Sequence, residues 1–253
     1  MTEHEVGENK HLYYTKNRLF INSVLGCASN CHYCYLDDIG LAKGKILTKI
    51  DSNKIIASLE QYKSSFLQPN RVIVSFGCYS DPWAKISRQD TIEIIKYLDK
   101  DNYKMTISTK QYIDVSDLEN LRQINKSNLV FLVSMPITKE LSNYEKGTSS
   151  IRLRIRSIEN LKNLGFKVAI YVKPFIPNVT IQGLPIIKGI MENYEVPIVL
   201  GKLFTVNGAG ELAVVSKSVE LYEHECEEYL MMKNYLQEFG IVYEHSYEVF
   251  ETI

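Results

Sequence analysis

Three cysteines stand close together near the start of the chain, in the stretch from Gly26 to Leu36. Cys27, Cys31 and Cys34 are separated by three and then by two residues. Thiolates at this spacing favour a shared inorganic centre over disulfides, and they are one short of the four protein ligands that an ordinary iron–sulfur cluster takes. One iron of such a cluster would stay open, and it could bind a group that is not protein.

Three other interpretations of these cysteines are compatible with their spacing. Structural zinc takes four ligands, usually as two separated pairs, and His32 is the only nearby candidate for the fourth. Cys31 and Cys34 could form a redox-active pair, which leaves Cys27 without a role. All three could also be buried structural thiols without a metal. A [4Fe–4S] cluster with one open iron uses all three cysteines.

The composition limits the class of protein. The 253 residues are 45% apolar, which suits one large α/β domain with a substantial core. The longest apolar runs fall well short of the roughly eighteen residues of a transmembrane helix, and the N-terminus has no basic start followed by an apolar block. The five cysteines, odd in number and clustered, argue against a secreted disulfide scaffold and favour a cytoplasmic location.

The charge is distributed unevenly along the chain. Residues 206–253 contain ten Glu and two Lys, a net charge of −8, so the preceding residues carry about +7 of the overall −1. The net positive charge of residues 1–205 suits an anionic ligand, a nucleic acid or simply a solvated surface. The acidic end is a poor surface for a phosphate backbone, and a solvated helix face is its ordinary interpretation.

Strand-like and helix-like segments alternate along the chain. Strands are expected at 18–25, 72–76, 105–108, 129–133, 167–172 and 197–204, with a last one at 241–243. Helices are expected at 54–66, 88–98, 117–124, 149–164, 184–194 and 219–239, and a turn at 208–210. This alternation predicts βαβ units and a parallel sheet, in an α/β fold that is either an open doubly wound sheet or an incomplete barrel. We expect a core at 1–205 and an acidic, helical extension at 206–253, packed on the same domain.

In either fold, chemistry belongs at the carboxyl ends of the strands. The cysteine stretch follows the first expected strand, and Cys78 follows the second. Lys110 follows the third strand, Ser134 ends the fourth and Lys173 ends the fifth. These side chains are therefore expected at one end of the sheet.

The cysteine spacing, the strand before it and the six repeats together resemble the radical S-adenosylmethionine (SAM) superfamily. Its hallmark is C-x3-C-x2-C after the first strand of a partial (β/α)6 TIM barrel, with an aromatic residue before the third cysteine, here Tyr33. The resemblance covers Arg18 to Phe204. It implies that Cys27, Cys31 and Cys34 bind three irons of a [4Fe–4S] cluster while SAM chelates the fourth. It also implies reductive cleavage of SAM to methionine and a 5′-deoxyadenosyl radical that abstracts hydrogen from a substrate.

The stretch after the second expected strand resembles the spore photoproduct lyase branch of that superfamily. Most members have a Gly-Gly-Glu-like stretch there, whereas this chain has Phe76-Gly77-Cys78-Tyr79-Ser80-Asp81-Pro82. In that branch a cysteine near a Ser-Asp pair returns a hydrogen atom to the product. The resemblance therefore implies a hydrogen-donor role for Cys78 and places Ser80 and Asp81 at the cofactor.

The same branch implies roles for residues elsewhere in the chain. Lys110 and Ser134 match positions that contact SAM, and Tyr33 and Tyr35, which flank the third cluster cysteine, match a radical relay. Lys173 is expected to face the site as well. Ordinary alternatives stay open: a lone cysteine is usually a small buried residue, a tyrosine can simply pack, a lysine can lie at the surface and an aspartate can cap a turn.

Two further sets of residues are expected outside the site. Arg152, Arg154 and Arg156 occupy alternate positions of an expected helix, so they span more than one face and cannot all point toward the site; a position facing the site stays open, and a solvated position is expected for them. Cys226 lies in the Glu-rich segment and is expected to be structural or exposed.

The C-terminal part departs from the lyase branch, because it is short, acidic and without a recognisable DNA-binding element. Three functions therefore stay open. The first is a lyase-like radical SAM enzyme with an unidentified substrate and a reductant such as flavodoxin or ferredoxin. The second is repair of DNA photoproducts or action on another nucleic acid. The charge of about +7 on residues 1–205 supports it, whereas the acidic end does not favour it. The third is a cluster-containing partner or scaffold protein. No membrane association is expected.

Overall fold

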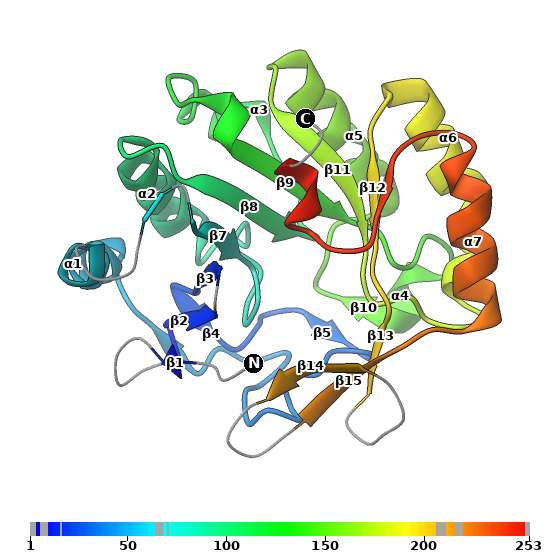
Figure 1. Ribbon diagram of the computed structural model, residues 1–253, viewed down its shortest axis with the longest axis horizontal. Coiled ribbons are helices and arrows are strands. Elements are labelled where there is room, and N and C mark those ends of the chain that lie inside the picture. The colour runs from blue at the N-terminus through cyan, green and yellow to red at the C-terminus, as the bar shows by residue number, and fades with distance from the viewer. Residues whose placement is uncertain are drawn as a thin grey trace.

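The computed structural model describes residues 4–5, 10–15, 17–63, 68–69, 71–205, 211–215 and 220–250. In this part of the chain a nine-stranded sheet curves through the centre, with helices along its outer side (Figure 1). Its parallel strands, in order, are β3 (Arg18–Ile21), β7 (Ile73–Phe76), β8 (Lys104–Thr109), β9 (Leu129–Ser134), β11 (Lys167–Val172), β12 (Ile198–Leu200) and β16 (Val242–Tyr243). Antiparallel strands β2 (Leu12–Thr15) and β1 (His4–Glu5) extend the sheet beyond β3.

A helix follows each of the first six parallel strands and returns the chain toward the start of the next. These helices are α1 (Ser52–Lys63), α2 (Arg88–Asp99), α3 (Val115–Glu119), α5 (Ile151–Asn163), α6 (Leu184–Tyr194) and α7 (Glu227–Gln237). The predicted α/β class, with the parallel strands of a partial (β/α)6 barrel, is confirmed.

The remaining elements are short. Strand β4 (Val24–Leu25) pairs with β6 (Thr48–Lys49), and β5 (Asn30–Cys31) pairs with β10 (Glu145–Lys146). Strands β13 (Leu203–Thr205), β15 (Glu220–His224) and β14 (Glu211–Val215) form a separate antiparallel sheet. The short helices are α4 (Leu141–Tyr144), η1 (Lys126–Asn128), η2 (Thr180–Gly183) and η3 (Glu248–Phe250).

Side chains alternate between the two sides of the sheet, as an extended backbone requires. In β9, Phe131 and Val133 pack under the outer helices, whereas Val130 and Leu132 belong to a smaller cluster on the inner side. Burying each such side chain stabilises the fold by roughly 1.5–3 kcal/mol, which fixes the register of the strand. Ser134 continues the inner row at the carboxyl end of β9.

The C-terminal segment fills part of the inner side of the sheet. Tyr243 of β16 and Val249 of η3 pack against Val130, Leu132 and Ala169, which lie in the first part or the middle of their strands. Figure 1 shows this segment in red across the inner side of β9 and β11. The carboxyl ends of the strands, where the predicted site residues lie, are thus left for other groups.

The strand predicted at 18–25 is interrupted in the structure. The backbone N–H of Asn22 donates to the carbonyl oxygen of His11 (2.8 Å), and its side-chain oxygen accepts from the N–H of Tyr79 (2.8 Å). These tertiary hydrogen bonds turn the chain out of the sheet after β3, so that β4 pairs with β6 instead. The strand β2 that lies beside β3 was not predicted.

The helix predicted at 219–239 is wrong in its first part. Residues 220–224 form β15, which pairs with both β13 and β14, and α7 begins only at Glu227. Pairing with two neighbouring strands outweighs the helical preference of this polar segment. The turn predicted at 208–210 lies outside the described residues. Among the residues described, no helix has the length and apolar character needed to cross a membrane.

Candidate active site

The loop that carries the three cysteines is shaped by its backbone. It leaves β4 at Gly26, whose φ is +81°, and a Cβ at this position would lie 2.5 Å from the carbonyl oxygen of Lys45. Only glycine fits here without strain. Further along, β5 pairs with β10 and sets Cys31 opposite Glu145. The loop is therefore anchored to a segment more than a hundred residues away in sequence.

The three thiols share one electrostatic environment. Cys31 is 7% exposed, Cys27 and Cys34 are half-buried, and all three are free thiols. Burial raises the pKa of each thiol, that of Cys31 to about 12, and the positive charge of Lys110 opposes the rise in all three. The fold therefore brings Lys110, which follows β8, to the cysteine loop.

The donor set fits a cluster better than a single metal ion. Over the described ranges, no three Cys, His, Asp or Glu side chains converge as the ligands of one ion do. The side chain of His32, the fourth ligand that a zinc site would need, is exposed. A [4Fe–4S] cluster is wider, because each of its irons takes its own thiolate. Three free thiols on one loop match that requirement.

Tyr33, the aromatic residue before Cys34, is held from two sides. Its hydroxyl donates to the carboxylate of Glu145, and the ammonium nitrogen of Lys110 lies 5.7 Å from the centre of its ring. Burial and the neighbouring negative charge of Glu145 raise the pKa of Tyr33, so the phenol stays protonated and remains a donor. Tyr33 is thus a hydrogen-bonded part of the cysteine loop.

Arg154 is fully buried, so the solvated position expected for it is wrong. Its guanidinium pairs with Glu145 and donates to the carbonyl oxygens of Ser134 (2.8 Å) and Ser149 (2.9 Å). These partners satisfy a charge that would otherwise be costly to bury. The sequence does contain a signal for this position, because residues 154, 157, 158 and 161 form one stripe at helical spacing, and all four are buried.

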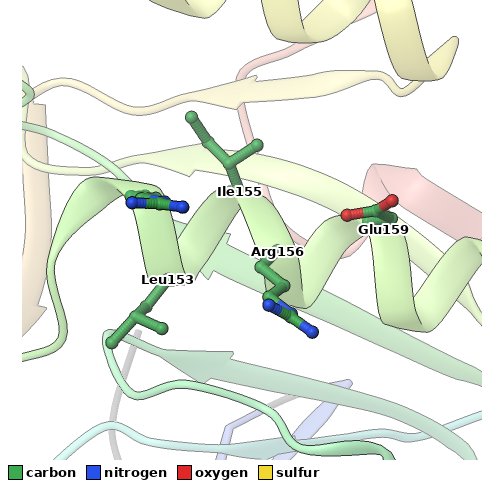
Figure 2. A pocket seen from close by; sticks show the side chains of 5 residues that line it. Leu153, Ile155, Arg156 and Glu159 are labelled. Atoms are coloured by element: carbon green, nitrogen blue, oxygen red, sulfur yellow. The ribbon is translucent and has the colours of Figure 1, made fainter.

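Arg152 and Arg156 are exposed, as expected. Figure 2 shows the outer surface of α5, where an open pocket is lined by Arg152, Leu153, Ile155, Arg156 and Glu159. The three arginines of this helix thus divide between a buried position behind the cysteine loop and a solvated surface. Arg152 offers a matched control for any test of Arg154.

The loop after β7 packs so closely on β8 that one position has no room for a side chain. At Gly77 φ is +100°, and a Cβ would lie 2.6 Å from the carbonyl oxygen of Ser108 and 2.9 Å from Pro82. Gly77 therefore sets both the path of the loop and the place of Cys78, the next residue.

We expect Gly77→Ala to destabilise the fold by roughly 2–4 kcal/mol, since the new methyl group adds overpacking to an unfavourable φ. Urea unfolding measures this loss. Gly165→Ala is the matched control, because Gly165 also has a positive φ (+74°) but a Cβ there would meet no atom within 4 Å. Equal losses in the two variants would show that steric contact at Gly77 contributes nothing.

Asp81 links the loop after β7 to the end of β8. Its carboxylate accepts from the hydroxyl of Thr109 (2.6 Å), the backbone N–H of Lys110 (2.9 Å) and the backbone N–H of Trp83 (3.0 Å). The contact with Trp83 is a turn-capping role, and the other two fix where Lys110 leaves its strand. The neighbouring Ser80 is half-buried on the same loop.

Cys78 is half-buried and has tyrosines around it. The hydroxyl of Tyr13 donates to its sulfur (2.9 Å), and the hydroxyl of Tyr35 donates to its backbone carbonyl oxygen (3.0 Å). Cys78 also packs against the apolar cluster that includes Tyr79, together with Cys27 and Cys34. The fold therefore brings Cys78 next to the cysteine loop. Tyr13 was not singled out from the sequence, because the strand that carries it was not predicted.

Ser134 presents a buried polar group at the candidate site. Its hydroxyl is buried and has no hydrogen-bond partner among the described residues, although its backbone carbonyl accepts from Arg154. Buried hydroxyls are nearly always paired in folded proteins, so this one is available to a bound group. Ser134 lies at the carboxyl end of β9, close in the sheet to the end of β8.

Lys173 follows the carboxyl end of β11, at the same end of the sheet as the other predicted site residues. Its ammonium group pairs with Glu223 of β15 (2.7 Å), and its aliphatic stem lies where a Cβ at Gly201 would be, 2.5 Å from its Cδ. Burial lowers the pKa of Lys173, while the charges of Glu223 and Cys78 oppose the shift. The ammonium group is thus within electrostatic reach of Cys78. Glu223 falls in the segment predicted as helix, so no sequence pattern connects it to the site.

Comparisons with known proteins agree with this geometry. A family model described as spore photoproduct lyase matches residues 17–182, more than half of the chain. The spore photoproduct lyase of Clostridium acetobutylicum is 29% identical over 153 residues, which are 60% of this chain and 44% of that protein. The chain therefore spans less than half the length of this curated relative.

Two of the solved structures that share the fold illustrate the likeness. A spore photoproduct lyase complexed with dinucleoside spore photoproduct superposes with a TM-score of 0.67 at 17% identity, covering 90% of this chain and 76% of that one. SuiB of Streptococcus suis, bound to S-adenosylmethionine, superposes with a TM-score of 0.62 at 14% identity, covering 92% of this chain and 50% of that one.

Proposed function

Because the chain belongs to the spore photoproduct lyase family of the radical SAM superfamily, we propose that it is a radical SAM enzyme of the lyase type. Its site lies at the carboxyl ends of β3, β7, β8 and β9. The observation that carries the proposal is the set of three free thiols on one anchored loop, Cys27, Cys31 and Cys34, with the charge of Lys110 acting on all of them.

Cys27, Cys31 and Cys34 would hold a [4Fe–4S] cluster, and SAM would complete the coordination of its fourth iron. With both groups bound, the reduced cluster supplies the electron that cleaves SAM to methionine and a 5′-deoxyadenosyl radical. The role of the protein is to hold the two groups together and to keep water away from them. Its partly buried loop and closely packed neighbours suit that task.

Five residues are proposed to orient the cofactor. Lys110 offers a positive charge to a carboxylate such as that of SAM, and the unpartnered hydroxyl of Ser134 offers a buried hydrogen bond. Ser80 lies on the same loop as Cys78, and Asp81 acts through the hydrogen bonds that position Lys110. Lys173 contributes a second positive charge at the carboxyl end of β11, offset by its pairing with Glu223.

Cys78 is proposed to return a hydrogen atom to the product radical. Thiols are good hydrogen-atom donors, and this one lies beside the cysteine loop on a strand end that is fixed by Gly77. Tyr33 and Tyr35 flank Cys34 and are proposed as relay residues by family resemblance. The hydrogen bond from Tyr35 to the carbonyl of Cys78 supports its place in such a relay. The hydroxyl of Tyr33 is directed to Glu145.

A thymine photoproduct is the specific substrate that we propose to test. A dinucleoside spore photoproduct is bound in one of the solved structures that share this fold, and the positive charge of residues 1–205 is compatible with a nucleic acid. Phosphate contacts need Lys and Arg, and the acidic segment 206–253 supplies only two Lys. We therefore propose the dinucleoside as the first probe and leave long duplex DNA as the second.

The proposed reaction needs a one-electron donor of the flavodoxin or ferredoxin class. The five free cysteines suit a reducing compartment, and we propose the cytoplasm as the place of action.

Anaerobic reconstitution tests the proposal directly. We expect the chain to take up about four irons, and dithionite with SAM to release 5′-deoxyadenosine. Dinucleoside spore photoproduct carrying deuterium at the carbon that is attacked should then transfer the label into 5′-deoxyadenosine. A chain that binds iron but never cleaves SAM would instead support a cluster-containing partner protein. Cleavage without label transfer would exclude this substrate and keep the radical SAM assignment.

A further inference from the structure

The hydroxyl of Tyr13 donates a hydrogen bond to the sulfur of Cys78 over 2.9 Å. Tyr13 comes from β2, the antiparallel strand beside β3, and 65 residues separate it from Cys78 in sequence. Tyr13 is only 6% exposed. The contact thus joins two buried or half-buried groups that the fold, and not local chain geometry, brings together.

Aromatic stacking fixes the ring of Tyr13 in place. Its ring lies 4.4 Å from that of Phe20 at an angle of 9°, and 5.0 Å from that of Tyr79 at an angle of 22°. A phenylalanine would fill the same space, and a thiol is a weak acceptor for a phenolic hydroxyl. Packing therefore does not explain the hydroxyl, whereas its position on the sulfur of Cys78 suggests a role in the chemistry of that sulfur.

The two relay tyrosines implied by the family are held differently. Tyr33 directs its hydroxyl to Glu145, whereas Tyr35 donates to the backbone carbonyl of Cys78 and its side chain also interacts with the thiol itself. Burial raises the pKa of Tyr13, so its phenol keeps the proton at neutral pH. What Tyr13 can give to a neighbouring radical is therefore a whole hydrogen atom.

We propose that Tyr13 is a hydrogen-atom donor to the sulfur of Cys78, a role that rests on the proposed function of Cys78. In the first step the S–H bond of Cys78 breaks, a C–H bond forms on the product radical and a thiyl radical remains. In the second step the O–H bond of Tyr13 breaks and the S–H bond of Cys78 forms again. Each step moves one proton with one electron, so the phenol is oxidised by one electron and the carbon radical is reduced by one.

The resulting phenoxyl radical must be reduced before the next cycle. One electron from the flavodoxin- or ferredoxin-class donor and one proton from solvent restore the O–H bond of Tyr13. The stacked rings of Phe20 and Tyr79 cover the phenol. Covering the radical in this way protects it from side reactions until the electron arrives.

Tyr13→Phe in the reconstituted protein tests this role, with dinucleoside spore photoproduct as the probe. The variant should give normal product in the first cycle, because Cys78 is intact, but it should complete several-fold fewer turnovers than the unchanged protein. Of the two described tyrosines that donate to Cys78, Tyr35 is then the one left to restore the thiol. Tyr14→Phe is the matched control: it is the same change one residue along β2, on the opposite side of the strand, and it should turn over repeatedly. A Tyr13→Phe variant that turns over as often as the control would overturn the proposal.

Cys78→Ala separates the failure of this inference from that of the proposed function. If Cys78 donates hydrogen, Cys78→Ala still cleaves SAM but diverts the product from the first cycle. Unchanged product would remove the proposed role of Cys78, and that of Tyr13 with it. Diverted product together with an unimpaired Tyr13→Phe would remove the role of Tyr13 alone.

A second measurement applies even if the probe is not turned over. Iodoacetamide alkylation of Cys78 in the reconstituted protein can be followed by peptide mass spectrometry, with Cys226 as the internal reference. Removing a hydrogen bond that stabilises the thiolate should slow the alkylation of Cys78 by about tenfold in Tyr13→Phe and leave Tyr14→Phe unchanged. An unchanged rate in Tyr13→Phe would show that its hydroxyl does not act on the sulfur.

Discussion

Cys31→Ala should lose the iron–sulfur cluster and, with it, all formation of 5′-deoxyadenosine. Cys31 is the most buried of the three loop thiols and lies in β5, where pairing with β10 fixes its backbone. Two remaining thiolates leave two irons of the cluster without a protein ligand, so the loss should exceed the ~10–100-fold typical of removing a group behind a metal ligand. Iron content per chain and 5′-deoxyadenosine release after dithionite and SAM measure the two effects.

Cys226→Ala is the control for this prediction. Cys226 is also a free thiol, but it is half-buried, precedes α7 and packs against the main core instead of the cysteine loop. Its removal should leave iron content and SAM cleavage unchanged. A Cys31→Ala chain that still makes 5′-deoxyadenosine would contradict the assignment of the loop as a cluster site, and with it the family-based mechanism.

The parts of the fold that the sequence predicts well are those set by local pattern. The apolar run at 167–172 ends before Pro174 and forms β11 within its predicted limits, and α6 occupies the predicted range 184–194. Both have hydrophobic residues at the period of the element and a breaker beside them. The right-handed βαβ rule then gives the hand of each connection, whereas the choice between a doubly wound sheet and an incomplete barrel is made only by the structure.

The parts that the sequence does not predict depend on partners far away in the chain. Glu145 is buried because Arg154 and Tyr33 are its partners, and 112 residues separate it from Tyr33. Nothing in the local pattern around Glu145 indicates burial, since it stands in a short, polar segment after α4. Tyr13 reaches Cys78 only because β2 folds back along β3. Cysteine spacing thus locates the site, whereas its supporting contacts appear only in three dimensions.

Arg154→Met should be among the most destabilising single substitutions in this chain, by about 3–5 kcal/mol, because it leaves the carboxylate of Glu145 buried without its countercharge. The carbonyl oxygens of Ser134 and Ser149 lose donors as well. For a chain of this length, the midpoint of thermal unfolding should fall by on the order of 10 °C. Arg152→Met, two residues away on the exposed side of α5, should change it little.

A double variant decides whether charge or packing causes that loss. In Arg154→Met combined with Glu145→Leu, no buried charge remains, so part of the lost stability should return. The return should be incomplete, since Tyr33 loses the acceptor of its hydroxyl and two carbonyl oxygens still lack donors. The expected order of midpoints is therefore wild type, double variant, Arg154→Met. A double variant no more stable than Arg154→Met would mean that the shape of the guanidinium, and not its charge, holds β10 against the cysteine loop.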